Sequence, residues 1–399
     1  MKNRQAHVLI AGAGPTGLFC ALKLARQGIR VSVFEALPDR ALDLRASTIH
    51  PPTMEMLDEV GVMPQLLAQG LQSPYWQFRD RRAGCVAVFD LSLLKDEARF
   101  PFRLQCEQFK VTAALLGELQ KLPSAEVHFN TRASGVAQDE QGVVLCLDRQ
   151  GESVRVTGDY LIGADGAGSA IRKAMNIEFE GFTYPERFLL VSTPHEFRDA
   201  MPDLALSNYV SDPEEWLVML RVKDFWRVLF PTRPEETDAQ VMEEASLQRR
   251  LAGICPLPGP LPIAHRTIYS VYQRVAARYR NGRVLLVGDA AHINNPLGGM
   301  GMNGGIHDAM NLADKLARVI RGADPGLLDR YARQRRAVAL DYVQQWTHRN
   351  REILRETDPV VREANLDELR RIASDAALAR PYLRKTSMMA SLDMARSIA

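Results

Sequence analysis

Hydrophobic and polar residues alternate in blocks that predict a strand, a helix and a second strand at the start of the chain. Residues 6–11 form a short apolar run, residues 18–27 have the composition of a helix, and residues 30–35 form a second apolar run that ends in Glu35. A glycine-rich turn, GAGPTG, lies between the first strand and the helix. This order is typical of a parallel βαβ unit whose turn binds a phosphate group.

Two more apolar runs end in a similar turn. Residues 127–131, 142–148 and 153–158 alternate apolar and polar positions, which predicts a small antiparallel meander. The meander leads into a buried strand at 160–164 that ends at Asp165-Gly166, and a third strand at 283–287 ends at Gly288-Asp289. Because the carboxyl ends of parallel strands share one edge of a sheet, we expect the three turns to meet at one ligand site.

The rest of the pattern predicts a second sheet and a helical end. The stretches EEWLVMLRV and DFWRVLFPT, within residues 179–231, alternate as strands do. Residues 346–399 have helical composition with many charged residues. We expect this end to pack on the nucleotide-binding part or on a partner subunit rather than to form a lid.

Composition narrows the classes of protein. The chain has 399 residues, 46% of them hydrophobic and 25% charged, with a net charge of +2, which gives no electrostatic case for nucleic acid binding. No apolar stretch approaches the roughly 18 residues of a membrane span. The first apolar run leads into a glycine turn rather than a cleavage site, so we expect a cytoplasmic protein without a membrane partner. The five cysteines are scattered without a CxxC pair, so neither a disulfide framework nor a metal site is expected.

The first turn has the residue types that a dinucleotide requires. Gly12 permits the tight turn, Gly14 lets the backbone approach a pyrophosphate, and Gly17 allows the helix to pack closely on the strand. Pro15 and Thr16 open the helix, whose N-terminal amides attract phosphate. Glu35 can accept hydrogen bonds from a ribose hydroxyl and disfavours a 2′-phosphate, which leaves FAD or NAD. Three such turns favour the longer FAD.

The three segments GAGPTG, GADGAGSAIR and GDAAHINNPLGGMGMNGGIHDAMNLADKLA resemble the fingerprints of flavoprotein aromatic hydroxylases, the single-component FAD monooxygenases of the p-hydroxybenzoate hydroxylase type. The resemblance covers residues 5–345. It implies an α/β fold with a Rossmann-like FAD-binding domain, an α+β substrate domain with a mixed sheet, and a helical C-terminal segment. The expected boundaries are 1–75, 101–178 and 276–345 for the FAD-binding domain, 76–100 and 179–275 for the substrate domain, and 346–399 for the helical segment.

The resemblance also implies which residues hold the cofactor. Asp289, after Gly288, would bind the ribityl chain, and Asp165 and Gly166 would serve FAD and the nicotinamide nucleotide. Arg45 and Gln105 match places where relatives hold FAD. The loop expected along the flavin ring consists of Pro296, Leu297, Gly298, Gly299, Met300, Gly301, Met302 and Asn303. Pro296, Gly298 and Gly299 would face the reacting part of the ring, and Met300 stands where relatives often have Gln.

The implied reaction consumes NADPH or NADH and O2. Only one predicted βαβ unit carries GxGxxG in its first turn, so a separate nicotinamide domain is not expected. A flavin C4a-hydroperoxide would hydroxylate a phenolic or related aromatic or heteroaromatic small molecule. Candidate groups to stabilise a phenolate are Tyr184, His195, Tyr209, Arg221 and Arg227. We single out Tyr209 and Arg221 and assign no function to His50 or His265. For His292 we expect a structural role beside the loop and leave a contact with the active site open.

Several alternatives remain open from the sequence. An FAD-dependent epoxidase or isoprenoid-ring hydroxylase would have the same fold, and a flavin-binding protein without turnover would share the motifs. A flavin halogenase is disfavoured because its Trp-x-Trp-x-Ile-Pro signature is missing. The identity of the ring, the choice between NADPH and NADH, and the choice between a monomer and a homodimer are also open.

Overall fold

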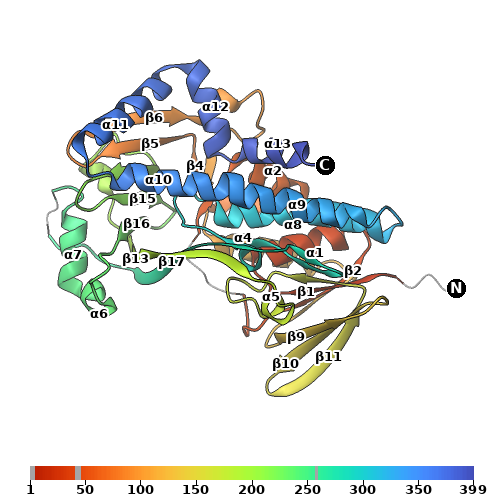
Figure 1. Cartoon of the computed structure of the whole chain (residues 1–399). Helices are drawn as coiled ribbons and strands as arrows, with labels where there is room; N and C mark the ends of the chain where they lie inside the picture. The colour runs from red at the N-terminus through yellow and green to blue at the C-terminus, as the bar shows by residue number, and fades with distance from the viewer. Residues whose placement is uncertain (1–4, 41–45, 257–258) are drawn as a thin grey trace.

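A computed structural model describes residues 5–40, 46–256 and 259–399 of the chain (Figure 1). Two large sheets organise these residues, and two sheets of three short strands accompany them. The first large sheet has six strands and the second has eight. This arrangement confirms the expected α/β class with a Rossmann-like part and a second, mixed sheet.

The six-stranded sheet contains the βαβ unit that the sequence predicted. Its strands, in spatial order, are β18 (Arg280–Asn281), β19 (Val284–Leu286), β12 (Tyr160–Gly163), β1 (His7–Ala11), β2 (Arg30–Phe34) and β8 (Ala125–His128). All neighbours are parallel except β18 and β19. The strands β1, β12 and β19 are almost entirely buried, as expected for a parallel sheet covered on both faces.

Helices pack closely on this sheet. They are α1 (Pro15–Ala25), α4 (Gln108–Leu119), α8 (Gly301–Ile320) and α9 (Gly326–Val338). A Cβ atom on Gly305 of α8 would collide with the Thr16 hydroxyl of α1, so the missing side chain lets the two helices approach. The loop expected along the flavin ring extended to Asn303. The helix α8 begins earlier, at Gly301, because the backbone becomes helical directly after Met300 and includes Met302 and Asn303.

The meander differs in one strand from the prediction. Residues 127–131 were expected as its first strand, but Val127 belongs to β8, which pairs with β2 in the six-stranded sheet. The meander consists of β9 (Arg132–Gln138), β10 (Val143–Arg149) and β11 (Glu152–Gly158). The pattern hid β9 because it contains Gly135 and a bulge in its pairing with β10 at Cys146 and Leu147.

The eight-stranded sheet is nearly all antiparallel. In spatial order its strands are β20 (His292–Ile293), β17 (His265–Ala276), β13 (Phe179–Thr193), β16 (Trp226–Pro231), β15 (Leu217–Arg221), β14 (Ser207–Ser211), β5 (Tyr75–Asp80) and β6 (Gly84–Asp90). Only β14 and β5 run parallel. The stretches EEWLVMLRV and DFWRVLFPT contain β15 and β16, so they are strands as predicted.

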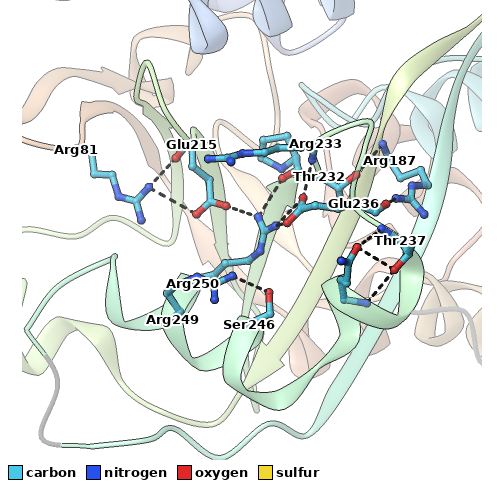
Figure 2. A network of polar contacts seen from close by, with 12 residues as sticks. Arg81, Arg187, Glu215, Thr232, Arg233, Glu236, Thr237, Ser246, Arg249 and Arg250 are labelled. Carbon is cyan, nitrogen blue, oxygen red and sulfur yellow. Dashed lines mark hydrogen bonds and ion pairs between the residues drawn. The ribbon is translucent and has the colours of Figure 1, made fainter.

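One face of the eight-stranded sheet is covered by α6 (Asp238–Met242) and α7 (Glu244–Ala252), together with η2 (Phe197–Asp199). A polar network joins α7 to the sheet, as Figure 2 shows. Arg250 of α7 pairs with Glu215 and, at 2.7 Å, with Glu236. Arg81, after β5, lies 3.8 Å from Glu215. The network holds the helix on the sheet through charges that the sheet partly buries.

Three C-terminal helices cover the other face of the eight-stranded sheet, and a fourth packs on α9 and α12. The three are α10 (Gln345–Arg355), α11 (Pro359–Ser374) and α12 (Ala376–Thr386), and the fourth is α13 (Met389–Ser397). A short π-helix, η4 (Ala339–Gln344), joins α9 and α10 into one long helical run (Figure 1). Leu354, Leu369 and Leu383 share a hydrophobic core with Trp76 and Phe89 of the sheet. This segment was expected to pack on the nucleotide-binding part or on a partner subunit. Most of it packs on the eight-stranded sheet instead, while α13 contacts α9 of the nucleotide-binding part.

A third layer of small elements joins the two sheets. The strands β3 (Thr48–Ile49), β7 (Arg103–Gln105) and β4 (Leu71–Ser73) form a short sheet, with α2 (Pro51–Glu59) and α3 (Met63–Gln69) between β3 and β4. Two further short helices are η1 (Leu91–Leu94) and α5 (Ala170–Ala174). Among the described residues, no helix is both long and apolar enough to cross a membrane.

Candidate functional site

The three predicted turns meet at one edge of the six-stranded sheet. Ala11 of β1 pairs with Gly163 of β12, and Gly163 pairs with Leu286 of β19, so the three strands end level with one another. The Val287 amide donates to Gly163 O at 3.0 Å. The expectation that these turns would lie side by side is confirmed.

The glycines of the first turn have different roles. Gly12 has φ +104°, and a Cβ there would collide with the Ala164 carbonyl of the second turn. A Cβ on Gly17 would collide with Gly12 O. Both glycines are therefore required by the fold itself. A Cβ on Gly14 would meet no atom within 4 Å, so its open side is left for a ligand at the N-terminus of α1.

Glu35 ends β2 beside this turn. Its Oε2 accepts a hydrogen bond from the Ala13 amide at 2.8 Å, and its Oε1 accepts one from the Leu37 amide at 3.0 Å. The carboxylate thus fixes the backbone of the glycine turn. Pro15 and Thr16 begin α1. The Thr16 side chain lies close to Gly288 and Gly305.

The second turn is tied to the third. Asp165 accepts hydrogen bonds from the Ser169 hydroxyl at 2.6 Å and from the Ile171 amide at 3.1 Å, so it caps the start of α5. Gly166 takes φ +78°, which favours glycine. Arg172 donates to Ala290 O at 2.8 Å and to Ala167 O at 2.7 Å. This arginine fixes the distance between the two turns.

The third turn, η3 (Gly288–Ala290), rests on a buried charged group. The Gly288 amide donates to Asp308 Oδ2 at 3.0 Å, and the same oxygen contacts His292 Nε2 at 2.8 Å. Arg335 Nε donates to Asp308 Oδ1 at 2.5 Å. Burial opposes the charged form of Asp308, but His292 and Arg335 lower its pKa overall. The exposed Asp289 therefore projects from a turn that this network holds in place, and His292 has the structural role expected for it.

The glycine loop at 296–303 lies against β3. Gly298 and Gly299 have φ values of +109° and +67°, and Gly299 N donates to Pro296 O at 2.9 Å. Asn303 donates through Nδ2 to Gly299 O at 2.6 Å and to Thr48 O at 2.8 Å. Its Oδ1 accepts from the His50 amide at 2.9 Å. Gly301 and Met302 begin α8, so the N-terminus of this helix lies at the end of the loop.

His50 supports the same loop. It is 0% exposed, and its Nε2 lies 2.8 Å from Gly298 O. Burial, and next the charge of Arg103, lower the pKa of His50 to about 3, so the ring is neutral. A neutral ring that donates from Nε2 to the carbonyl has an unprotonated Nδ1, and Nδ1 has no partner among the described residues.

The described residues fit FAD. Gln105 accepts at Oε1 from the Thr48 hydroxyl at 3.0 Å, but its Nε2 is buried without a hydrogen-bond partner in the described part of the chain. Ser47 Oγ beside it is in the same condition. A bound group with polar atoms at this place would satisfy them. Together with the open side of Gly14, these atoms mark a path from the first turn to the glycine loop. Arg45 lies outside the described residues.

A pocket opens on the glycine loop from the side of the eight-stranded sheet. Its walls come from the sheet, from β7, from the loop and from α10–α12, and the residues that line it are Trp76, Phe78, Arg103, Tyr209, Gly298, Met300, Asn350, Ile353, Leu354, Leu369, Tyr382 and Thr386. Trp76 stacks on Phe89 at 4.3 Å between ring centroids and meets Tyr209 edge-on at 5.6 Å. Tyr209 is thus brought to the pocket, as is Met300.

Arg103 is the charged residue of this pocket. It is 2% exposed, and its guanidinium lies 4.9 Å from the Trp76 ring centroid. Its Nε and Nη1 have no hydrogen-bond partner among the described residues. Burial lowers the pKa of Arg103, while the Tyr209 hydroxyl acts in the other direction by its charge and by hydrogen bonding.

The other predicted substrate groups lie elsewhere. Arg221 lies 3.4 Å from Glu196 and donates to Val222 O, and its strand neighbours Leu217 and Met219 pack in the core on the face opposite the pocket. Selecting Arg221 as a substrate contact is therefore not supported by its position. His195 contacts Phe197 on that same far side. Tyr184 and Arg227 are buried but do not line the pocket.

Sequence reasoning missed Arg103, His50 and Tyr382. Arg103 and His50 lie on strands of three and two residues or at their ends, which carry no periodic signal. Tyr382 comes from α12, more than three hundred residues after Trp76, which its ring faces at 6.3 Å. A local signal did exist for Arg103, since it stands two residues before the predicted cofactor ligand Gln105 and so shares its face of the strand.

Known proteins resemble this chain in sequence over most of its length. The FAD-binding domain family matches residues 5–346. The p-nitrophenol 4-monooxygenase of Pseudomonas sp. (strain WBC-3) is 33% identical over 380 residues, which cover 94% of each chain. The 6-hydroxy-3-succinoylpyridine 3-monooxygenase of Pseudomonas putida (strain DSM 28022 / S16) is 32% identical over 346 residues, 86% of each chain.

A solved structure shows the same fold. The crystal structure of p-nitrophenol 4-monooxygenase from Pseudomonas putida DLL-E4 matches with a TM-score of 0.91 at 29% identity, covering 99% of each chain. The family match extends over most of the chain, and the first relative is matched along nearly its whole length. The chain therefore belongs to the FAD-binding domain family and is a flavin-dependent monooxygenase of the aromatic hydroxylase type, with FAD as its cofactor.

Proposed function

We propose that this enzyme hydroxylates a compact, single-ring phenol with a second substituent, using NADPH or NADH and O2. The observation that carries the proposal is the pocket between the glycine loop and the eight-stranded sheet. Its walls are aromatic, with Trp76, Phe78, Tyr209 and Tyr382 around a short space that ends at Gly298 and Met300. Aromatic walls of this kind favour a flat aromatic ring as the ligand.

The relatives support the size of the substrate. The two relatives reported above are named for p-nitrophenol and for a substituted hydroxypyridine, both of which contain one aromatic ring. The charged Arg103 in the wall is unsuited to an isoprenoid hydrocarbon, because burying a guanidinium against apolar groups is unfavourable. The phenol therefore fits the pocket better than the substrate of an isoprenoid-ring hydroxylase.

The residues that would hold FAD follow the edge of the six-stranded sheet. We assign the pyrophosphate to Gly12, Gly14, Pro15, Thr16 and Gly17, the adenosine ribose to Glu35, and the ribityl chain to Gly288 and Asp289. The remaining assigned residues are Gln105, Asp165, Gly166, Pro296, Gly299, Met300, Gly301, Met302 and Asn303. When bound, FAD supplies the redox chemistry that is needed to take a hydride from the nicotinamide nucleotide and to activate O2.

The chain itself positions the ring and keeps water away. The amides of the glycine loop and the N-terminus of α8 form a positive edge that favours negative charge on a bound group. His50 and Asn303 hold this loop at a fixed place. Leu354, Leu369 and Ile353 of the C-terminal helices close the pocket against solvent, which limits wasteful release of peroxide.

The two large sheets correspond to the two proposed domains. We propose that the eight-stranded sheet, with residues 76–100 and 179–275, forms most of the substrate domain, and that residues 1–75, 101–178 and 276–345 form the FAD-binding domain. The pocket then lies at the boundary between them, where binding sites are common. The C-terminal helices complete the pocket wall on the substrate side.

The test is turnover by the FAD-loaded enzyme. Oxidation of NADPH and of NADH should be measured with and without single-ring phenols such as 4-nitrophenol, and product and hydrogen peroxide should be quantified. We expect a phenol to accelerate oxidation and to yield a hydroxylated product. Tyr382→Leu should raise KM and peroxide release, whereas Tyr75→Leu, on an exposed side chain, should change neither. If no single-ring phenol is hydroxylated, the proposal is wrong.

A further inference from the structure

We propose that Arg103 is the specificity-determining residue of the pocket and binds an anionic or strongly polar oxygen substituent on the aromatic ring. This inference rests on the proposed function, because it assumes that the pocket holds the substrate. It adds the chemical class of the substituent, which neither the aromatic walls nor the glycine loop specify.

The first observation is that Arg103 is buried and incompletely bonded. Its side chain is 2% exposed, and Nε and Nη1 have no partner among the described residues. An arginine has five N–H groups and no way to lose its charge under ordinary conditions. Buried guanidinium groups in proteins are normally paired with an anion or fully hydrogen-bonded, because the loss of water is costly. Arg103 therefore has capacity for an oxygen ligand.

The second observation is what surrounds the guanidinium. Its electrostatic neighbours are the phenol groups of Tyr209 and Tyr382, with no carboxylate among them. Three other buried arginines of this enzyme differ in this respect. Arg335 pairs with Asp308, Arg351 with Glu186, and Arg250 with Glu215 and Glu236. Within the described part of the chain, Arg103 lacks the protein anion that each of these has.

The third observation is the side of β7 on which the Arg103 guanidinium lies. Arg103 and Gln105 stand on the same face of β7, but the guanidinium of Arg103 lies over the Trp76 ring, on the substrate side of the strand. Trp76 and Tyr209 belong to β5 and β14 of the eight-stranded sheet. The charge is therefore presented to the same space as the aromatic walls, together with Tyr209 as a hydrogen-bond partner.

The chemistry of the ligand follows from these contacts. The guanidinium lies over the Trp76 ring, and its Nε and Nη1 have no partner among the described residues. The planar fork of N–H groups on an arginine matches planar oxygen groups. A phenolate oxygen, a nitro group and a carboxylate all offer such oxygens at the edge of a ring. Burial away from water strengthens each charge-assisted bond.

The experiment uses the FAD-loaded enzyme without a nicotinamide nucleotide, so that binding is measured apart from turnover. Ligand binding is followed by the change in flavin absorbance for 4-nitrophenol and for 4-nitroanisole, whose methyl ether removes the phenolate but retains the nitro group. The variants are Arg103→Gln and Arg103→Lys. Arg99→Gln, an exposed arginine over Phe100 four residues away, is the matched control.

We expect Arg103→Gln to weaken 4-nitrophenol binding by roughly 10- to 100-fold, which is the range for losing a charge-assisted hydrogen bond. Arg103→Lys should recover part of this loss, and Arg99→Gln should bind like the wild type. If Arg103→Gln weakens 4-nitrophenol but not 4-nitroanisole, the phenolate is the group that is bound. An equal loss for both ligands assigns the nitro oxygens instead. Both results support the inference.

Three results would overturn it. One is binding of 4-nitrophenol by Arg103→Gln within about twofold of the wild type. Another is loss of FAD from the variant without a specific loss of ligand, which would place Arg103 at the cofactor. The last is the absence of binding of either ligand to the wild type. A wild type that binds 4-nitrophenol through Arg103 but hydroxylates no single-ring phenol would refute the proposed function and leave this inference standing.

Discussion

Single polar residues buried around the glycine loop determine its shape. Asn303 bonds the loop to β3, and His50 contacts the Gly298 carbonyl. His307, on α8, contacts the Thr53 hydroxyl of α2 at 2.9 Å. Both histidines are buried, and burial is the main reason why the pKa of each falls to about 3. They are thus neutral hydrogen-bonding groups, and their cost appears only when the pH falls.

Because both histidines are neutral in the folded protein, we expect its stability to depend on pH. An unfolded histidine titrates near pH 6.5, whereas the folded rings titrate near 3, so unfolding takes up protons between these values. The stability contribution is complete above about pH 6.5 and declines as the pH falls toward 3. Each histidine should add roughly 1.4 kcal/mol per pH unit to the slope. Denaturant unfolding of the wild type at pH 7 and at pH 5 measures it.

The slope can be assigned by comparing variants. His307→Asn should lower stability at pH 7 but reduce the difference between pH 7 and pH 5. Thr53→Val removes the hydrogen-bond partner and retains the histidine, so it should lower stability without reducing that difference. Equal pH dependence in His307→Asn and the wild type would show that this histidine is not held neutral by the fold.

Asp289 makes a prediction for the cofactor. If it accepts hydrogen bonds from the ribityl chain, Asp289→Ala should weaken FAD binding by about 1.5–3 kcal/mol, the usual range for a hydrogen bond to a charged group. Titration of the apoprotein with FAD, followed by flavin fluorescence, measures the change. Asp329→Ala, which removes an exposed carboxylate paired with Arg280, should bind FAD like the wild type. Unchanged affinity in Asp289→Ala would remove this residue from the cofactor site.

At the scale of single residues, the sequence predicted residues within motifs better than residues of the pocket. The glycines and Glu35 follow a local rule, in which the order of strand, turn and helix fixes where they lie. Of the two side chains singled out, Tyr209 lines the pocket and Arg221 does not, because alternation along β15 shows two faces without telling which one faces the pocket. Arg103 acquires its importance from Trp76 and Tyr209, which only the fold brings near it.

The turns at the ends of β1, β12 and β19 act as one unit at the scale of elements. Each strand end contributes backbone to the next, since Gly12 packs on Ala164 and Arg172 joins the second turn to the third. The sequence predicted this edge because parallel strands end together. It did not predict β9, whose glycine and bulge obscure the alternation, or the early start of α8, where glycines hid the helical turn.

Two glycines of the first turn are expected to have different roles, one in folding and the other in FAD binding. Gly17→Ala places a methyl group against Gly12 O and should destabilise the protein by about 1–3 kcal/mol or more. Gly14→Ala meets no protein atom within 4 Å, so its stability should stay within about 1 kcal/mol of the wild type. Thermal unfolding of the apoproteins tests this pair.

FAD binding should respond differently in these variants. Gly14→Ala should bind FAD markedly more weakly than the wild type, because its methyl group occupies the side left open for the pyrophosphate. A Gly14→Ala protein that is stable and binds FAD normally would show that the cofactor does not approach this glycine. A Gly17→Ala protein as stable as the wild type would show that the close contact with Gly12 can relax.

The polar network in Figure 2 supports the eight-stranded sheet from the side away from the pocket. Burial raises the pKa of Glu215, and Arg250 opposes this effect by its charge. Arg250→Met would leave Glu215 and Glu236 without their main partner and should cost about 3 kcal/mol of unfolding free energy. Arg249→Met, which removes an exposed neighbour bonded to Ser246, should cost far less. Equal losses in denaturant unfolding would refute a specific role of the network.

At the scale of the whole molecule, the pocket is formed by segments that are far apart in the chain. The glycine loop lies at the end of the six-stranded sheet, Trp76 and Tyr209 come from the other sheet, and Tyr382 comes from the C-terminal helices. The sequence predicted the first two regions as separate parts. It did not predict that most of the C-terminal helices pack on the eight-stranded sheet, because helical composition shows that a segment packs but not which surface it packs against.

We propose that this arrangement lets one chain serve both cofactor and substrate. In this proposal FAD follows the strand ends, and the glycine loop forms the common wall between FAD and the aromatic pocket. The C-terminal helices close the pocket where it would otherwise be open to water. The central claim is that the ring bound in this pocket receives oxygen from O2 at the flavin.

Isotope labelling tests that claim most directly. The FAD-loaded enzyme should be supplied with NADPH or NADH and a phenol that stimulates oxidation under ¹⁸O2, and the product should be analysed by mass spectrometry. Our account predicts a product that gains one oxygen atom, labelled with ¹⁸O, in an amount that accounts for most of the nucleotide oxidised. Oxidation that yields only hydrogen peroxide, or a product whose new oxygen comes from water, would contradict it.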